Sequence, residues 1–172
     1  MEKRIKGKIV DIKDQSTKDF FNNRKNKNLP HRYNYVNYQD DEPEKVLERD
    51  RIEKKKIEPF IPFKEWNYIL DIGCGVGRWG DAVIPKLKSG KYIGIDYTQD
   101  FIDIAEKHFI NENSKFICAS FQTLKESLEK EKELREYDVI LINGVLMYIN
   151  DKDIDCCLGE IDEILKKGGL YI

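Results

Sequence analysis

Two hydrophobic periods alternate along the second part of the chain. Short apolar runs, each closed by a polar or glycine-containing turn, predict buried strands at residues 69–72, 92–95, 115–119 and 137–142. Between and after them, the sequence predicts a helix at about 79–87 that Pro85 ends or kinks, one at 98–109, a lysine- and glutamate-rich one ending near Leu134, and one from 151 to a Gly168-Gly169 cap. This alternation predicts a doubly wound α/β fold, with a mostly parallel sheet covered on both faces.

Residues 1–65 lack that alternation. A capping-box pattern at Ser16 predicts a short helix to about Arg24, and Asp41 followed by Pro43 predicts a second helix that Pro59 ends. The second helix is heavily charged with a weak apolar stripe, so it is either solvated or a mobile lid. We expect an N-terminal helical or lid segment, residues 1–65, and a core at residues 66–172.

The sequence predicts a fifth strand that barely begins, because only Leu170, Tyr171 and Ile172 follow Gly168-Gly169. An unfinished sheet would expose an apolar edge that proteins normally cover. We therefore expect the sheet to lack its last strands, and the 172 residues to be less than the whole functional protein.

The turn after the first predicted strand holds three alternating glycines, Gly73, Gly75 and Gly77. Glycine allows positive φ and lets a ligand lie against the backbone, so this is a candidate nucleotide-binding turn. Read from Gly75, the sequence matches the G-x-G-x-x-G dinucleotide fingerprint, but two residues late. Read from Asp71, it is Asp-x-Gly-x-Gly-x-Gly, whose carboxylate suits a ligand with an ammonium group.

Polar residues follow the other predicted strands, at the edge where a doubly wound sheet binds ligands. Asp96 follows the second strand, at the distance from Gly73 where an acid accepts ribose hydroxyls. Further candidate ligand-binding residues follow the third and fourth predicted strands, namely Ser120, Phe121, Asn143, Gly144, Met147 and Tyr148.

Because the glycine turn and these polar residues follow successive strands in the family's order, residues 66–172 resemble the class I S-adenosylmethionine-dependent methyltransferases. The resemblance implies S-adenosylmethionine as cofactor, Asp96 at its ribose, Ser120 and Phe121 at its adenine, and Asn143 at its methionine side. Ser120 stands where an acid is common in the family. The implied cofactor site also includes Asp71, Gly73, Cys74, Gly75, Arg78 and Tyr97.

The sequence points less clearly to the residues that would bind the methyl acceptor. The tyrosines of residues 31–39 either contact a ligand or form an aromatic packing strand, and both readings stay open. A tyrosine wall with a facing guanidinium would suit a small anionic or sugar-like acceptor. The candidate acceptor residues are Tyr33, Tyr35, Tyr38, Arg49, Arg51 and Met147.

Two residues are candidate general bases, in case the acceptor is a weak nucleophile. They are His31, which could instead be an exposed loop histidine, and Tyr148, which could instead be a core aromatic residue.

The N-terminal pattern Phe20-Phe21-x-x-Arg24 with Tyr33-Asn34 resembles methyltransferases of bacterial capsule and surface-glycan biosynthesis. That resemblance implies O-methylation of a sugar or phosphoramidate precursor. Two other classes stay open, an NAD-dependent oxidoreductase and a non-catalytic nucleotide-binding or partner module.

The composition of the chain indicates which kinds of partner it is not expected to bind. Charged residues make up 36% of the chain with a net charge of -2, so the basic footprint of a nucleic-acid-binding domain is missing. No apolar run approaches the roughly 20 residues of a membrane span, and no leader-like segment opens the chain. The four cysteines lack metal-ligand spacing. We expect a cytoplasmic protein without metal, membrane or nucleic acid; its oligomeric state stays open.

Overall fold

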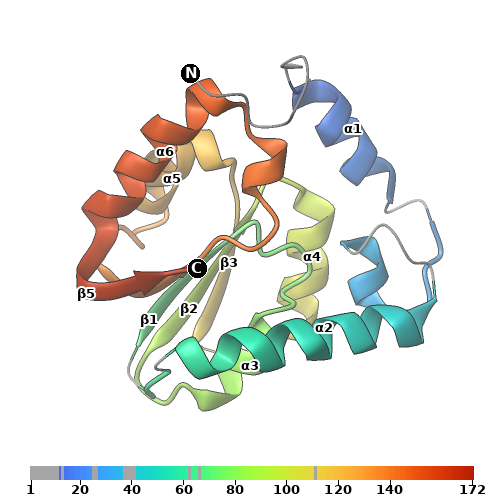
Figure 1. The fold of residues 1–172 in the computed structure, drawn as a ribbon, viewed down its shortest axis with the longest axis horizontal. Coiled ribbons are helices and arrows are strands. Elements are labelled where there is room, and N and C mark those ends of the chain that lie inside the picture. The colour runs from blue at the N-terminus through green and yellow to red at the C-terminus, as the bar shows by residue number, and fades with distance from the viewer. Residues whose placement is uncertain are drawn as a thin grey trace.

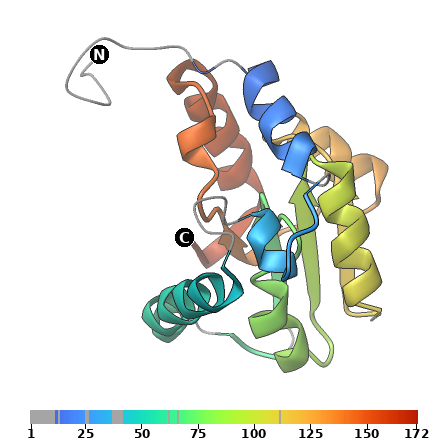
Figure 2. The same ribbon diagram turned by 90° about the vertical axis from the view of Figure 1, so that its right-hand side faces the viewer.

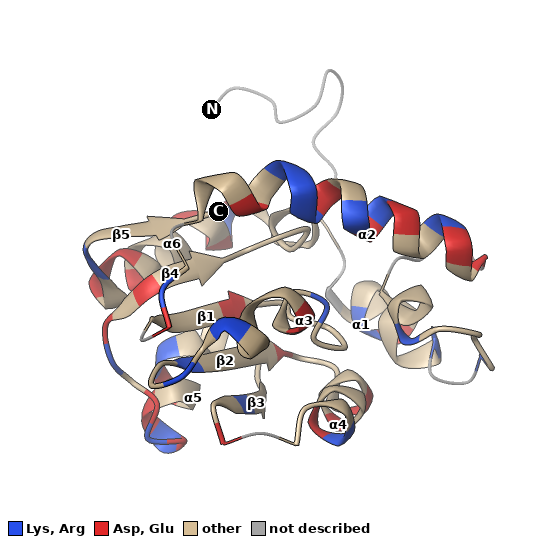
Figure 3. Ribbon diagram, turned by 90° about the horizontal axis from the view of Figure 1, so that it is seen from below, with Lys and Arg blue, Asp and Glu red and all other residues tan. Residues whose placement is uncertain are grey.

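The computed structural model describes residues 12, 14–24, 27–36, 42–61, 63–65, 67–110 and 112–172, so the candidate residue Tyr38 lies outside the described residues. Within this part of the chain, five parallel strands form one sheet in the order β3-β2-β1-β4-β5 (Figures 1 and 3). The strands are β1 (Tyr68–Ile72), β2 (Lys91–Asp96), β3 (Ser114–Cys118), β4 (Tyr137–Leu141) and β5 (Leu165–Tyr171). The predicted doubly wound parallel sheet is confirmed.

The apolar runs form the middle of the sheet because both of its faces are covered. Leu70 of β1 lies in register with Ile93 of β2 and Ile140 of β4, and all three side chains are buried. Helices α5 (Leu124–Lys130) and α6 (Asp151–Ile164) pack on one face, and α3 (Gly80–Val83) and α4 (Gln99–His108) on the other (Figure 1). The chain crosses from β3 to β4 over β2 and β1, which creates a switch point between β1 and β4.

The α-helix α3 gives way to the 3₁₀ turn Ile84–Lys86 at Pro85, as expected, because proline has no amide hydrogen to continue the helix. Two other predicted helix ends were wrong. Helix α5 ends at Lys130, before the expected Leu134. Helix α6 ends at Ile164, well before Gly168-Gly169.

The last strand begins earlier than expected. Leu165 pairs with Tyr137, and Leu170 with Val139, so the four residues between Leu165 and Leu170 bulge out of the ladder. Gly168 lies in this bulge with φ of 80°. The glycine pair therefore serves a bulge inside β5, where a helix cap had been expected.

The N-terminal segment contains α1 (Asp14–Arg24), the 3₁₀ helix η1 (Arg32–Tyr35) and α2 (Pro43–Ile57), which lie around the sheet core (Figure 2). The capping role of Ser16 was wrong, because α1 already begins at Asp14. The packing strand considered for residues 31–39 was also wrong where they are described, since Arg32–Tyr35 is helical. Phe21, Tyr33 and Val46 pack with Val76 and Phe101 of the core.

Candidate active site

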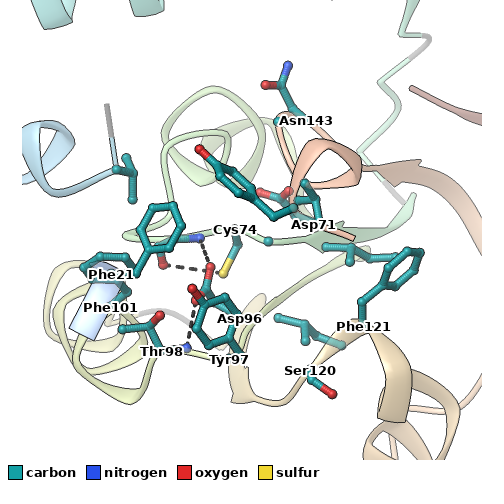
Figure 4. A pocket seen from close by; sticks show the side chains of 18 of the residues that line it. Phe21, Asp71, Cys74, Asp96, Tyr97, Thr98, Phe101, Ser120, Phe121 and Asn143 are labelled. Atoms are coloured by element: carbon teal, nitrogen blue, oxygen red, sulfur yellow. Dashed lines mark hydrogen bonds between the residues drawn. The ribbon is translucent and has the colours of Figure 1, made fainter. Parts of the chain in front are cut away.

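A cavity of about 630 Å³ opens at the carboxyl ends of β1, β2 and β4. Its walls come from the core and from α1 and α2 of the N-terminal segment. It is lined by every residue that the sequence assigned to the cofactor, Asp71, Gly73, Cys74, Gly75, Arg78, Asp96, Tyr97, Ser120, Phe121 and Asn143. Several of these side chains surround one open space in Figure 4.

The glycine turn is packed tightly on both sides. Gly73 and Gly75 have φ of 72° and 54°, in the left-handed region that other residues rarely adopt. A Cβ atom on Gly73 would overlap with Cγ2 of Val145, and one on Gly75 would lie 2.5 Å from Cγ1 of Val36. Glycine is therefore required at both positions for conformation and for space.

Asp96 lies at the centre of the cavity wall, where two backbone amides fix its carboxylate (Figure 4). Gly75 N donates to Oδ2 at 3.0 Å and Thr98 N donates to Oδ1 at 2.8 Å. Burial raises the pKa of Asp96, and these two hydrogen bonds oppose that rise. Each carboxylate oxygen has a further lone pair, so Asp96 can accept hydroxyl hydrogens from a ligand.

Asp71 is the second buried acid of the site. It is 2% exposed and accepts a hydrogen bond from the hydroxyl of Tyr92. Burial raises its pKa to about 7, although Tyr92 and Arg78 act in the opposite direction. The Asp71 carboxyl group therefore loses its proton near neutral pH, and a cationic group in the cavity would favour the ionised form.

An aromatic cluster that the sequence did not predict forms another part of the wall. The ring of Phe21 lies 5.2 Å from Tyr148, 6.2 Å from Tyr97 and 6.3 Å from Phe101, between centroids. Phe21 reaches these partners because α1 lies beside the end of β2, where the Tyr97 hydroxyl donates to Thr17 O at 3.3 Å. Other lining residues missed by sequence reasoning include Thr17, Lys18, Val36, Glu53, Thr98 and Asp153.

Tyr148, Arg49 and Met147 also line the cavity, and their assigned roles stay predictions. Four other candidates lie elsewhere and are absent from its lining: His31, Tyr33, Tyr35 and Arg51. Their assigned roles stay predictions.

Two of these four side chains make polar contacts within or beside η1. His31 caps η1, with Nδ1 accepting from Tyr33 N at 3.1 Å, and burial lowers its pKa. Tyr33 is buried, with its hydroxyl donating to Asp81. Both side chains are therefore engaged away from the cavity.

The other two differ in their exposure. Tyr35 packs near Phe101, with 6.5 Å between ring centroids. Arg51 is exposed and pairs with Glu48 on the same helix. Arg51 therefore lies on the solvent side of α2, whereas Arg49 lines the cavity.

No group of three or more potential metal ligands occurs among the described residues. In the same part of the chain, none of the helices combines the length and the apolar character that a membrane crossing requires.

The site and the fold agree with a comparison to protein families. Residues 70–171 match the model of a methyltransferase domain. The chain belongs to the methyltransferase family. The predicted relationship to class I S-adenosylmethionine-dependent methyltransferases is thereby confirmed, and it is favoured over the oxidoreductase alternative.

Individual relatives are more distant. The methyltransferase chain is 28% identical over 122 residues to phosphoethanolamine N-methyltransferase 1 of Triticum aestivum, covering 70% of this chain and 23% of that protein. It is 30% identical over 105 residues to malonyl-[acyl-carrier protein] O-methyltransferase 2 of Ilyobacter polytropus, covering 60% and 37%. The match thus spans only 23% and 37% of the length of these two relatives.

A solved structure has the same fold. Phosphoethanolamine N-methyltransferase 1 of Haemonchus contortus, in complex with phosphoethanolamine and S-adenosylhomocysteine, superposes with a TM-score of 0.72 at 17% identity. The match covers 89% of this chain and 30% of that one.

Proposed function

We propose that this chain binds S-adenosylmethionine in the cavity and directs its methyl group to a small-molecule acceptor. The observation that carries the proposal is that all ten residues assigned to the cofactor from sequence line one cavity. Their chemistry fits the ligand, because Asp96 can accept ribose hydroxyls and Asp71 can balance an ammonium group. The glycine turn provides the close backbone approach between them.

The bound cofactor would supply a methyl group on an activated sulfonium. The residues of the chain would then mainly align the acceptor and exclude water. Phe21 and Tyr148 supply an aromatic wall that would exclude water. Tyr148 stays the candidate base inside the cavity, whereas His31 is a helix cap outside its lining.

Asp96→Ala is expected to weaken S-adenosylhomocysteine binding. The variant removes the carboxylate assigned to the ribose, which costs about 1.5 to 3 kcal/mol, or roughly tenfold to a hundredfold in Kd. Calorimetry on the 172-residue chain measures this directly. Asp100→Ala, an acid on the first turn of α4 outside the cavity lining, is the matched control. An unchanged Kd in Asp96→Ala would disprove the assignment.

The acceptor that we propose is a small anion. Arg49 and Lys18 bring positive charge to the cavity lining, and a guanidinium binds phosphate or carboxylate through two hydrogen bonds. The acceptors named in two relatives, phosphoethanolamine and malonyl-[acyl-carrier protein], both carry an anionic group. A sugar or phosphoramidate precursor of a capsule or surface glycan remains a candidate on the sequence pattern alone.

Arg49→Ala is expected to raise the KM for an anionic acceptor about tenfold or more, because a charged hydrogen bond contributes about 1.5 to 3 kcal/mol. Arg51→Ala is expected to leave KM unchanged, because Arg51 pairs with Glu48 on the exposed side of the same helix. Steady-state kinetics over a panel of phosphate, carboxylate and neutral acceptors tests both. Equal KM values in the two variants would disprove the anionic-acceptor assignment, and binding without turnover of any acceptor would favour a non-catalytic module.

A further inference from the structure

A continuous series of polar contacts joins the glycine turn to α2. It begins at Arg78, directly after the turn, whose guanidinium donates to Asp50 at 3.0 Å and to Glu53 at 2.7 Å. Asp50 is 6% exposed and also pairs with Lys54 at 2.7 Å. One buried carboxylate thus holds two cations, one from the turn and one from α2.

The series continues through Tyr33 and returns to the turn. Lys54 Nζ donates to the Tyr33 hydroxyl at 3.5 Å and lies 5.2 Å from the centroid of its ring. The same hydroxyl donates to Asp81 of α3, which also pairs with Arg32. Arg32 in turn donates to the carbonyl oxygen of Val76, within the glycine turn. The contacts therefore form a closed ring.

Asp50 lies beside the point where the ring meets the cavity, because its partner Arg78 lines the cavity. Arg49 precedes it and Glu53 follows one turn later, and both line the cavity. Figure 3 shows α2 as a helix of mixed charge along one side of the molecule. Most of its charges are exposed, so the contacts of the buried Asp50, together with the Arg78–Glu53 pair and the packing of Val46, orient this part of α2 toward the turn.

We infer that Asp50 is a positioning residue. It couples occupancy of the glycine turn to the placement of Arg49, the residue of α2 that would contact the acceptor. The inference rests on the proposed function, since it assumes that the turn holds the cofactor. A ligand that fixes the turn also fixes Arg78, Val76 and Asp81. These contacts restrict α2 in the position that brings Arg49 to the cavity. The turn and α2 then share a coupling free energy, and couplings of this kind change affinity by about 5-fold to 150-fold.

The test measures amide hydrogen exchange with and without S-adenosylhomocysteine, alongside acceptor kinetics. In the unmodified chain, the ligand should slow exchange both at residues 73–77 and in α2. Asp50→Asn keeps the side-chain volume and removes the charge. It should retain slowed exchange at residues 73–77, lose most of it in α2, and raise the acceptor KM by about fivefold or more.

Two further variants make the result decisive. Tyr33→Phe removes one hydroxyl from the ring and should reduce the protection of α2 even if Asp50→Asn does not fold. Glu48→Gln changes an exposed acid on the same helix and should behave as the unmodified chain.

The outcomes separate this inference from the proposed function. Full α2 protection in Tyr33→Phe and in any folded Asp50→Asn protein overturns the coupling and leaves the proposed function standing. Loss of α2 protection with the turn still protected supports it. Absence of protection at residues 73–77 in the unmodified chain overturns the proposed function and the coupling together.

Discussion

Replacing Asp71 by Asn is expected to stabilise the fold by up to about 4 kcal/mol at pH 8 and to change little at pH 4. Burial raises the pKa of this acid to about 7, from 3.8 for an ordinary aspartate. Below the lower value, both the folded and the unfolded chain hold the proton. As the pH rises toward the folded value, the unfolded chain ionises first and the folded state loses stability. Each pH unit costs about 1.4 kcal/mol.

Denaturant unfolding of both proteins from pH 4 to pH 8 measures the difference. Asp138→Asn provides a control of opposite sign. Burial works to raise the pKa of Asp138, but hydrogen bonds from Tyr68 N and Lys166 hold it below its ordinary value. Its carboxylate therefore stabilises the fold above that ordinary value, and the contribution is lost as the pH falls through the folded value. An Asp71→Asn effect that stays constant across this range would contradict the prediction.

Gly73→Ala is expected to destabilise the fold by about 2 to 5 kcal/mol. An alanine at φ of 72° costs about 1 to 2 kcal/mol of backbone strain, and overpacking costs about 1 to 3 kcal/mol more. The second cost arises because the new methyl group would overlap with Val145 Cγ2, so the Val145 side chain or the turn must move. Thermal or denaturant unfolding gives the free energy, and calorimetry gives the accompanying loss of S-adenosylhomocysteine affinity.

Two matched variants separate strain from overlap. Gly168 has φ of 80°, and apart from Gly168 and its two chain neighbours no described residue has an atom within 4 Å of the position that a methyl group would occupy, so Gly168→Ala should show the strain alone. Val145→Ala should rescue part of the Gly73→Ala loss, because it removes the overlapping methyl group. The overlap argument fails if Gly73→Ala and Gly168→Ala are equally destabilising.

The edge of the sheet that carries the site could be predicted from sequence because local pattern and topology act together there. Short apolar runs fixed β1, β2 and β4, and parallel strands bring their carboxyl ends to one edge. Asp71, Asp96 and Asn143 therefore share one cavity although they are far apart in the chain.

The end of α6 could not be predicted in the same way. Leu165 continues the helical spacing of Ile161 and Ile164, so the local pattern favours a longer helix. Pairing of Leu165 with Tyr137 of β4 instead places it in the sheet. A contact between residues distant in sequence overrides the local preference.

The wall supplied by the N-terminal segment also depends on distant contacts. Phe21 and Tyr33 look alike as aromatic residues in polar surroundings, yet Phe21 lines the cavity and Tyr33 does not. Asp81, 48 residues away, accepts the Tyr33 hydroxyl and so decides its position. Nothing in the sequence around Tyr33 signals this partner.

The contact between Ile12 and Asn150 limits how early the N-terminal segment can dock while the chain is being synthesised. The Asn150 side chain accepts from Ile12 N at 2.8 Å and donates to Ile12 O at 3.0 Å, across 138 positions of sequence. At about 5 to 20 residues per second, synthesis of that interval takes roughly 7 to 28 s. After α1 has been translated, Phe21 still lacks Tyr148 and the preceding Ile12 still lacks Asn150 until the end of this interval. The cavity therefore cannot be complete until synthesis has passed Tyr148 and Asp153, which line it.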